Sequence, residues 1–307
     1  MSTTHSTPRG SHCGRTLVIA THTFTQLARM KVFYFLAIFA VIIIASNFLD
    51  LQQLHGPESA GANVLESIKS SSFGAMHLFS VVLSVVATAL LLPKDVEDRT
   101  LYTILAKPVP RLDYLAGKLL GVLLLVFVSL ALMDVLMTLV LQIRTSMILT
   151  QQTELAAAAG YPPDAIASLR AETLTNGPNA SLQYAVLAVF LRASIMASMA
   201  LLISTFSTST LFTTMVGFVV YFIGHFQADA RDFYLQMGQA GQGACSRAIS
   251  LLTSLGLPDF QLFNVIDAVI EGQAMPLLLL GKLALVAFYY ALFFTLASWF
   301  IFSAKEF

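Results

Sequence analysis

"DVEDRTLYTILAKPVPRLDYLAGK", residues 95–118, is the densest run of charge in a chain that is otherwise strongly apolar. It lies between two apolar runs, at about 73–93 and 119–143, and each run is long enough to form a membrane helix. Of the 307 residues, 57% are hydrophobic and only 11% are charged, whereas soluble domains carry about 25% charged residues. The composition therefore indicates an integral membrane protein with a charged hairpin tip between two of its helices.

The apolar runs predict the number of membrane spans. A helix that crosses roughly 30 Å of hydrocarbon needs about 20 apolar residues, and an open chain satisfies its backbone groups in lipid only as a helix. We therefore predict an all-α integral membrane protein, with a single six-span domain over residues 15–307 after a disordered cytoplasmic tail at residues 1–14. The predicted spans are residues 31–49, 73–93, 119–143, 183–205, 209–226 and 276–302.

The distribution of lysine and arginine predicts the orientation. With the N-terminus inside, ten basic residues flank the cytoplasmic ends of the spans and five lie in the outer loops, which fits the positive-inside rule. Both termini are then cytoplasmic, in the inner (plasma) membrane of the cell. Basic and acidic residues number seventeen each and form no basic tract, so nucleic acid is not an expected partner, whereas membrane lipid is.

Three segments outside the spans have helical patterns. Residues 15–31 place apolar residues at helical spacing, which fits either an amphipathic helix in the inner interface or the cytoplasmic beginning of the first span. Residues 144–182 suggest two short outer helices, separated by Gly160 and a proline pair. In residues 227–275 the apolar piece before Pro258 is too short to span, and a further helix is expected at the outer surface.

The charged stretch itself predicts a short cytoplasmic helix at residues 95–106. Acidic residues stand where this helix would begin and Lys107 stands near its end, which suits the helix dipole. Pro108 would stop the helix, and a second start follows at Pro110. Such a helix can either dock in a groove on a soluble partner or cap the hairpin on the lipid headgroups.

The stretch, continued as "RTLYTILAKPVPRLDYLAGKLLG", resembles the segment between spans two and three in permease subunits of ABC-2-type ABC transporters. The branch identified with multicopper-enzyme maturation is the most similar. Pro110 stands where that family usually has serine, so a capping hydroxyl is missing. The matching positions are Glu97, Thr100, Leu101, Leu105, Pro108, Val109, Arg111, Gly117 and Lys118.

The resemblance implies that residues 95–106 form a coupling helix that contacts a separate ATPase subunit. It also implies a second permease copy or a homologous permease, because six spans are half of such a transporter, and it favours export. The residues expected to carry the coupling are Glu97, Arg99, Thr100, Leu101, Leu105, Pro108 and Arg111.

Motifs for catalysis are not found in the sequence. "LAGKLLG" lacks the earlier glycine and the Ser or Thr of a P-loop, so ATP is expected to bind the partner subunit and this chain is expected to need no cofactor. The six histidines are too dispersed to predict a metal site, and His77 is interpreted as a satisfied interface residue. We therefore expect no enzymatic activity from the chain alone.

Two ionisable residues fall well inside predicted spans. Asp134 lies nine residues before the expected outer end of span three, and Arg192 lies nine residues after the outer start of span four. An isolated charge at mid-span costs about 2.5–3.5 kcal/mol on insertion scales. We therefore predict an intramembrane Asp134–Arg192 ion pair, which serves either as a clasp between helices or as part of a substrate path. The rival function is a secondary transporter or channel that needs no ATPase.

Overall fold

The computed structural model describes residues 12–31, 60–97, 110–207, 209–227 and 258–304, together with Tyr34 and residues 37–38 and 41–42. Within these ranges the secondary structure is helical, with no strand. The elements are α1 (His12–Ala28), α3 (Ala60–Glu97), α5 (Arg111–Ala158), α6 (Pro163–Asn176), α7 (Ala180–Phe206), α8 (Thr210–His225), η1 (Phe260–Phe263), α11 (Ile266–Ile270) and α12 (Leu277–Ala304).

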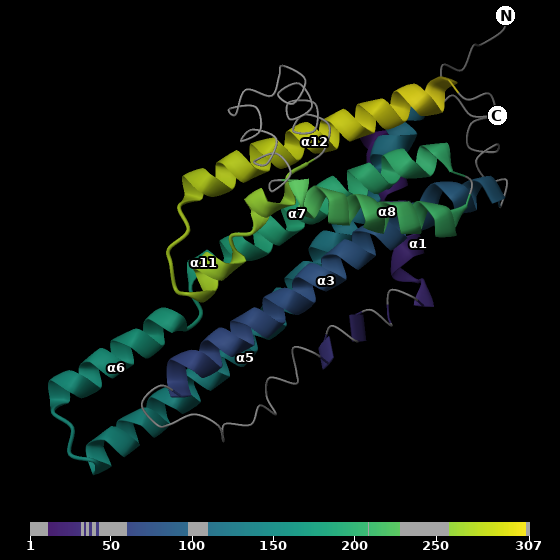
Figure 1. The fold of residues 1–307 in the computed structure, drawn as a ribbon. Coiled ribbons are helices and arrows are strands. Elements are labelled where there is room, and N and C mark those ends of the chain that lie inside the picture. Colours follow the sequence, from purple (N-terminus) through teal and green to yellow (C-terminus); the bar gives the residue numbers. More distant parts are fainter. Residues whose placement is uncertain are drawn as a thin grey trace, which may run out of the picture.

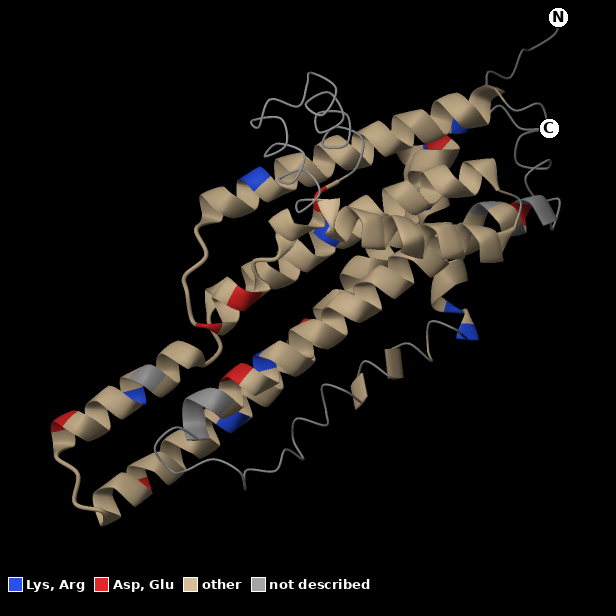
Figure 2. Cartoon of the chain, in the orientation of Figure 1, with Lys and Arg blue, Asp and Glu red and all other residues tan. Residues whose placement is uncertain are grey.

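The long helices α3, α5, α7, α8 and α12 form one bundle, in which α7 packs against α3, α5, α8 and α12 (Figure 1). Charged residues are sparse along these helices (Figure 2). Four helical stretches are long and apolar enough to cross a membrane: Val64–Leu91, Arg111–Ala158, Pro163–Phe206 and Leu277–Ala304. The chain is therefore a multi-pass helical membrane protein, as its composition predicts.

Two of the six predicted spans are not among these four. The predicted first span, residues 31–49, lies mostly outside the described residues. The predicted fifth span corresponds to α8, which has 16 residues and is therefore about 24 Å long, less than the hydrocarbon thickness. Helix α8 begins after Ser209, which caps it by accepting a hydrogen bond from the backbone N–H of Phe212.

Helix α5 is much longer than the predicted third span. It has 48 residues, about 72 Å at 1.5 Å per residue, and it continues past residue 143 into the segment predicted to hold a separate outer helix. The polar residues there do not end the helix, because their hydroxyl groups donate to carbonyls one turn back. Ser146 donates to Ile143 and Thr153 to Leu149.

The α5–α6 connection contains the helix-ending and helix-starting residues that the sequence predicted. Gly160 has a φ of +72°, a conformation that glycine adopts without a steric penalty. Pro163 opens α6 at the first helical position, where its missing N–H costs nothing. The two helices form a hairpin that projects from one end of the bundle (Figure 1).

The C-terminal connection is packed into the bundle. Phe260, Phe263 and Val269 are buried in η1 and α11, which contact α7, α8 and α3. Lys69 is one of the five basic residues that the predicted orientation places in outer loops, but it lies within α3 with a fully buried side chain. Its Nζ donates to the carbonyl of Ile270 at 3.3 Å. The helix predicted at the outer surface is thus two short helical segments that are partly buried against the bundle.

Candidate functional site at the base of the bundle

The charged hairpin begins and ends in a buried cluster. Lys118 Nζ of α5 lies 2.7 Å from Asp95 Oδ2 of α3, and the hydroxyl of Tyr114 donates to the same oxygen at 2.5 Å. Asp95, Tyr114 and Lys118 are 6%, 1% and 4% exposed. We call these three residues the base cluster. Removing one partner of a buried ion pair costs about 3–5 kcal/mol, because the other charge is left unpaired, so the cluster holds α3 and α5 together.

The last turn of α12 joins this region through Arg111. Its Nη1 donates to the carbonyl oxygens of Phe302 at 2.9 Å and Ser303 at 2.7 Å. These carbonyls belong to the end of α12, where a cation is favourable against the negative end of the helix dipole. The ring of Phe302 also stacks on Tyr114, with centroids 6.1 Å apart. Three long helices therefore meet beside the charged hairpin.

Helix α1 packs along α5 beside the base cluster. A Cβ added at Gly117 would lie 2.7 Å from Cβ of Ile19, and one added at Gly121 would lie 2.6 Å from Cβ of Thr23. Two small residues four apart let helix backbones approach closely in membranes. The "GKLLG" segment is thus not a P-loop but the part of α5 against which α1 packs most closely.

A side-chain contact adds to this packing at the first turn of α5. His12 Nδ1 lies 2.9 Å from Asp113 Oδ2, and Asp113 is 5% exposed. The helix predicted over residues 15–31 is present as α1, but it runs from His12 to Ala28 and so begins inside the tail at residues 1–14 that was predicted to be disordered. Its Leu17 and Val18 are exposed, at 62% and 66%.

Only two of the predicted coupling residues fall in the described part of the chain. Arg111 lies in the base, and Glu97 is the last residue of α3. The predicted helix start at Asp95 is wrong, because α3 continues through Pro93 to Glu97 without a break. The other predicted coupling residues lie outside the described residues: Arg99, Thr100, Leu101, Leu105 and Pro108.

Sequence reasoning missed the base cluster because it assigned Asp95 and Lys118 to helix ends in water. Their position in the sequence could have indicated the cluster, because each residue lies within one helical turn of an apolar run. If the helix continues past the end of the run, the charged side chain is buried against the rest of the protein. The two residues flank the hairpin tip, and their contact fixes the tip to two helices at once.

The predicted Asp134–Arg192 ion pair is wrong, because the two residues lie at different levels along the contact between α5 and α7. Asp134 instead accepts a hydrogen bond from Gln183 at 3.1 Å. Seven residues away on each helix, the rings of Phe127 and Phe190 make an edge contact with centroids 5.4 Å apart, which gives the same antiparallel register. Arg192 lies nine residues beyond Gln183, about 13 Å further along α7.

Arg192 has aromatic and histidine partners on α8. Its Nη2 lies 3.4 Å from the hydroxyl of Tyr221 and 3.3 Å from Nδ1 of His225. The hydroxyl of Tyr221 also lies 2.9 Å from Nε2 of His77, so the interpretation of His77 as a satisfied residue is confirmed. Cation–π contacts of a desolvated guanidinium are worth about 2 kcal/mol, which offsets part of the cost of burial.

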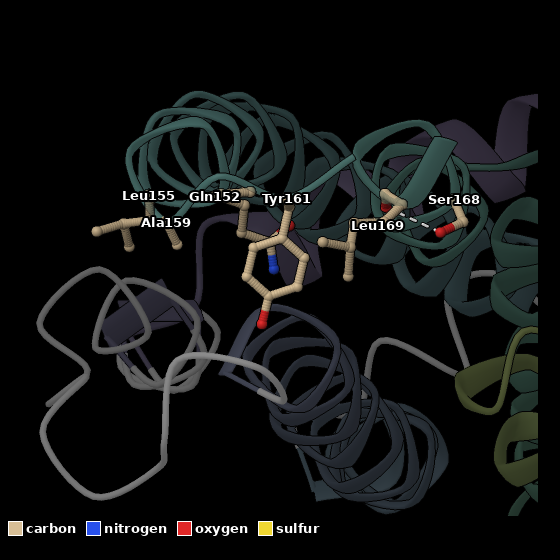
Figure 3. A pocket seen from close by; sticks show the side chains of 8 residues that line it. Gln152, Leu155, Ala159, Tyr161, Ser168 and Leu169 are labelled. Atoms are coloured by element: carbon tan, nitrogen blue, oxygen red, sulfur yellow. Dashed lines mark hydrogen bonds between the residues drawn. The ribbon is translucent and has the colours of Figure 1, made fainter. Parts of the chain in front are cut away.

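A cavity of ≈ 550 Å³ lies on the projecting hairpin between α5 and α6. Figure 3 shows Tyr161 and Leu169 directed toward it, with Leu155 and Ala159 nearby. Its volume is in the range of small-molecule pockets, and its named lining residues carry no charge. Within the described ranges, no group of His, Cys, Asp and Glu residues could hold a metal ion.

The fold defines a multi-pass helical membrane protein in which the buried Asp95–Lys118 pair and Arg111 lie at one end of the bundle. A family model described as ABC-2 family transporter protein matches residues 23–161, which include the C-terminal part of α1, all of α3 and all of α5. Over residues 23–161 the chain is therefore similar to ABC-2 family transporter proteins, and this similarity supports a membrane permease subunit of an ABC transporter. No curated protein is similar enough in sequence to serve as a relative.

The match confirms the resemblance inferred from the charged stretch, although it does not confirm the multicopper-enzyme maturation branch. It covers the base cluster and the whole of residues 95–118. Similarity to this family supports an ABC ATPase subunit as a partner, and permeases of this family are typically dimeric.

Proposed function

We propose that this chain is the transmembrane subunit of an ATP-driven exporter and that a separate ATPase subunit drives it through residues 95–106. ATP binds to the partner, and this chain supplies the path across the membrane. The proposed contact residues are Glu97, Arg99, Thr100, Leu101, Leu105, Pro108 and Arg111.

The base cluster is the observation that supports this proposal. The hairpin tip can pass a motion to the membrane helices only if it is firmly attached to them. The 2.7 Å contact between Lys118 and Asp95 joins the two flanks of the tip, which belong to α5 and α3. Arg111 connects the same point to the end of α12. A displacement of the tip would therefore move α3, α5 and α12 together rather than bend a loose loop.

The mechanism follows from these connections. Closure of an ATPase dimer would push the hairpin tips of two permease copies, and the base would pass the motion to the long helices. The helices would then alternate between arrangements that open the path to either side. In this scheme the base and both termini face the cytoplasm, the protein sits in the inner (plasma) membrane, and the α5–α6 hairpin projects on the other side.

Co-purification with the cognate ATPase tests the proposal. Glu97→Lys and Leu101→Asp should abolish retention of the ATPase by the detergent-solubilised permease. On α6, Asp164→Lys likewise reverses an acidic charge and Leu174→Asp repeats the leucine change, both at exposed positions. These two variants should leave retention unchanged. Vesicle transport without any ATPase would contradict the proposal and would favour a secondary transporter or channel.

A further inference from the structure

Arg192 occupies an unusual position in the middle of α7. It lies twelve residues after Ala180 and fourteen before Phe206, and its side chain is only 4% exposed. A guanidinium stays protonated and only donates hydrogen bonds, so the oxygen of Tyr221 and Nδ1 of His225 both act as acceptors toward it. The helix therefore carries a permanent positive charge within the bundle.

Two aromatic rings lie beside this charge. The guanidinium carbon lies 5.4 Å from the centroid of Tyr221 and 5.3 Å from that of Phe260, and these two rings stack on each other. We call Arg192, His77, Tyr221, His225 and Phe260 the Arg192 cluster. Its members come from α7, α3, α8 and η1, so distant parts of the chain converge on one cation.

The cluster has no acidic member. Among the residues that the structure describes, no carboxylate forms an ion pair with Arg192, and Asp134 is engaged by Gln183. The Nε of Arg192 is buried without a hydrogen-bond partner. Charged residues inside membrane proteins are costly, and they mark substrate or ion pathways.

The cluster also lies where a membrane helix stops. Helix α8 ends at His225, beside the midpoint of α7, and η1 continues the packing with Phe260 against Gly224 and Gln261 bonded to the carbonyl of His225. Interrupted helices near the middle of the bilayer form the substrate sites of many transporters. Irregular backbone at such depth occurs where protein or a cavity surrounds it.

We infer that the Arg192 cluster binds the anionic group, a carboxylate or a phosphate, of an amphiphilic ligand. A guanidinium presents parallel N–H groups that fit both of these anions, and Nε is the donor that remains without a partner. The aromatic rings suit the apolar part of such a ligand. This inference names a cargo class for the proposed exporter, but binding to the permease can be measured without the ATPase, so the two ideas fail separately.

Native mass spectrometry of the purified full-length chain tests the inference with dodecyl phosphate and dodecanoate as probes. Dodecyltrimethylammonium serves as the cationic comparison. We expect retention of both anions over the cation, and Arg192→Gln should lower anion retention at least about tenfold, the loss of one charge-assisted contact. Lys282→Gln removes an exposed cation from α12 and should change nothing. If Arg192→Gln does not fold, Arg192→Lys and Tyr221→Phe replace it, with a smaller loss expected for each.

Equal retention of anions by the wild type and by the folded Arg192 variants would overturn the inference. The sequence also carries Asp229 and Asp232, which follow α8 outside the described residues and are the rival source of a carboxylate. Anion binding that occurs only after Asp229→Asn and Asp232→Asn would mean that the chain supplies its own counter-ion, and this result would overturn the inference as well.

Discussion

Lys118 Nζ lies 2.7 Å from Asp95 Oδ2, and both side chains are buried although 23 positions separate the two residues in the sequence. Their contact closes the charged hairpin onto the bundle. Burial makes the pair sensitive to the loss of either partner, while its net contribution to stability over an apolar pair is small. A buried pair of this kind fixes geometry more than it adds free energy.

The first prediction concerns this pair. Asp95→Asn should lower the free energy of unfolding by about 3–5 kcal/mol, because Lys118 would remain buried without its counter-ion. The double variant Asp95→Leu/Lys118→Met should recover most of that loss, since it removes both charges. Chemical unfolding in detergent, arranged as a double-mutant cycle, measures the coupling between the two sites.

Glu154→Gln provides the control for this cycle, because Glu154 is exposed on the distal part of α5. A surface change of this kind should alter stability by less than about 0.5 kcal/mol. Strictly additive effects of the Asp95 and Lys118 substitutions would show that the two side chains do not interact.

The second prediction concerns the close contact of α1 with Gly117 and Gly121 of α5. Gly117→Ala and Gly121→Ala should each destabilise the protein by about 1–3 kcal/mol, because the new Cβ would lie within 3 Å of Ile19 or Thr23. Gly74→Ala and Gly281→Ala place the same methyl group in open space on α3 and α12. These two should be neutral or stabilising by about 0.5–1 kcal/mol, since alanine favours helix.

Thermal unfolding of the four glycine variants distinguishes packing from helix propensity. Because propensity acts equally at all four sites, a common shift in melting temperature would mean that α1 does not rest on these glycines. A loss confined to the two base positions supports the close contact.

The third prediction concerns Arg111. Arg111→Ala should destabilise the protein by about 1.5–3 kcal/mol, because two hydrogen bonds from a charged donor to the end of α12 are lost. Hydrogen exchange should then increase in the last turn of α12. Arg170→Ala, at an exposed position on α6, should leave both stability and exchange unchanged, and equal effects of the two substitutions would contradict the role of Arg111.

Local chemistry in the sequence predicted the α5–α6 connection correctly. Gly160 and Pro163 separate the two helices, because backbone conformation at a turn is decided by a few adjacent residues. The length of α5 was not predictable in the same way. Its polar outer part resembles a loop in composition, and hydroxyl groups that bond within the helix give no contrasting pattern.

Contacts between helices were the less predictable part. The sequence places Asp134 and Arg192 at similar distances from the expected ends of their spans, but α5 has no end at residue 143. Register between antiparallel helices depends on side-chain packing along their whole length, such as the contact of Phe127 with Phe190. The base cluster was missed for a related reason, because Asp95 lies inside α3 rather than at the start of a new helix.

The last prediction tests this register by cross-linking. In a Cys13→Ser/Cys245→Ser background, Asp134→Cys/Gln183→Cys and Phe127→Cys/Phe190→Cys should react efficiently with a short bis-thiol reagent, whereas Asp134→Cys/Arg192→Cys should not. The structure separates the last pair by nine residues along α7, about 13 Å. Charge reversal gives an independent measurement, since Asp134→Arg combined with Arg192→Asp should fold no better than either single variant. Rescue by the double reversal, together with a 134–192 cross-link, would restore the ion pair and refute the observed register.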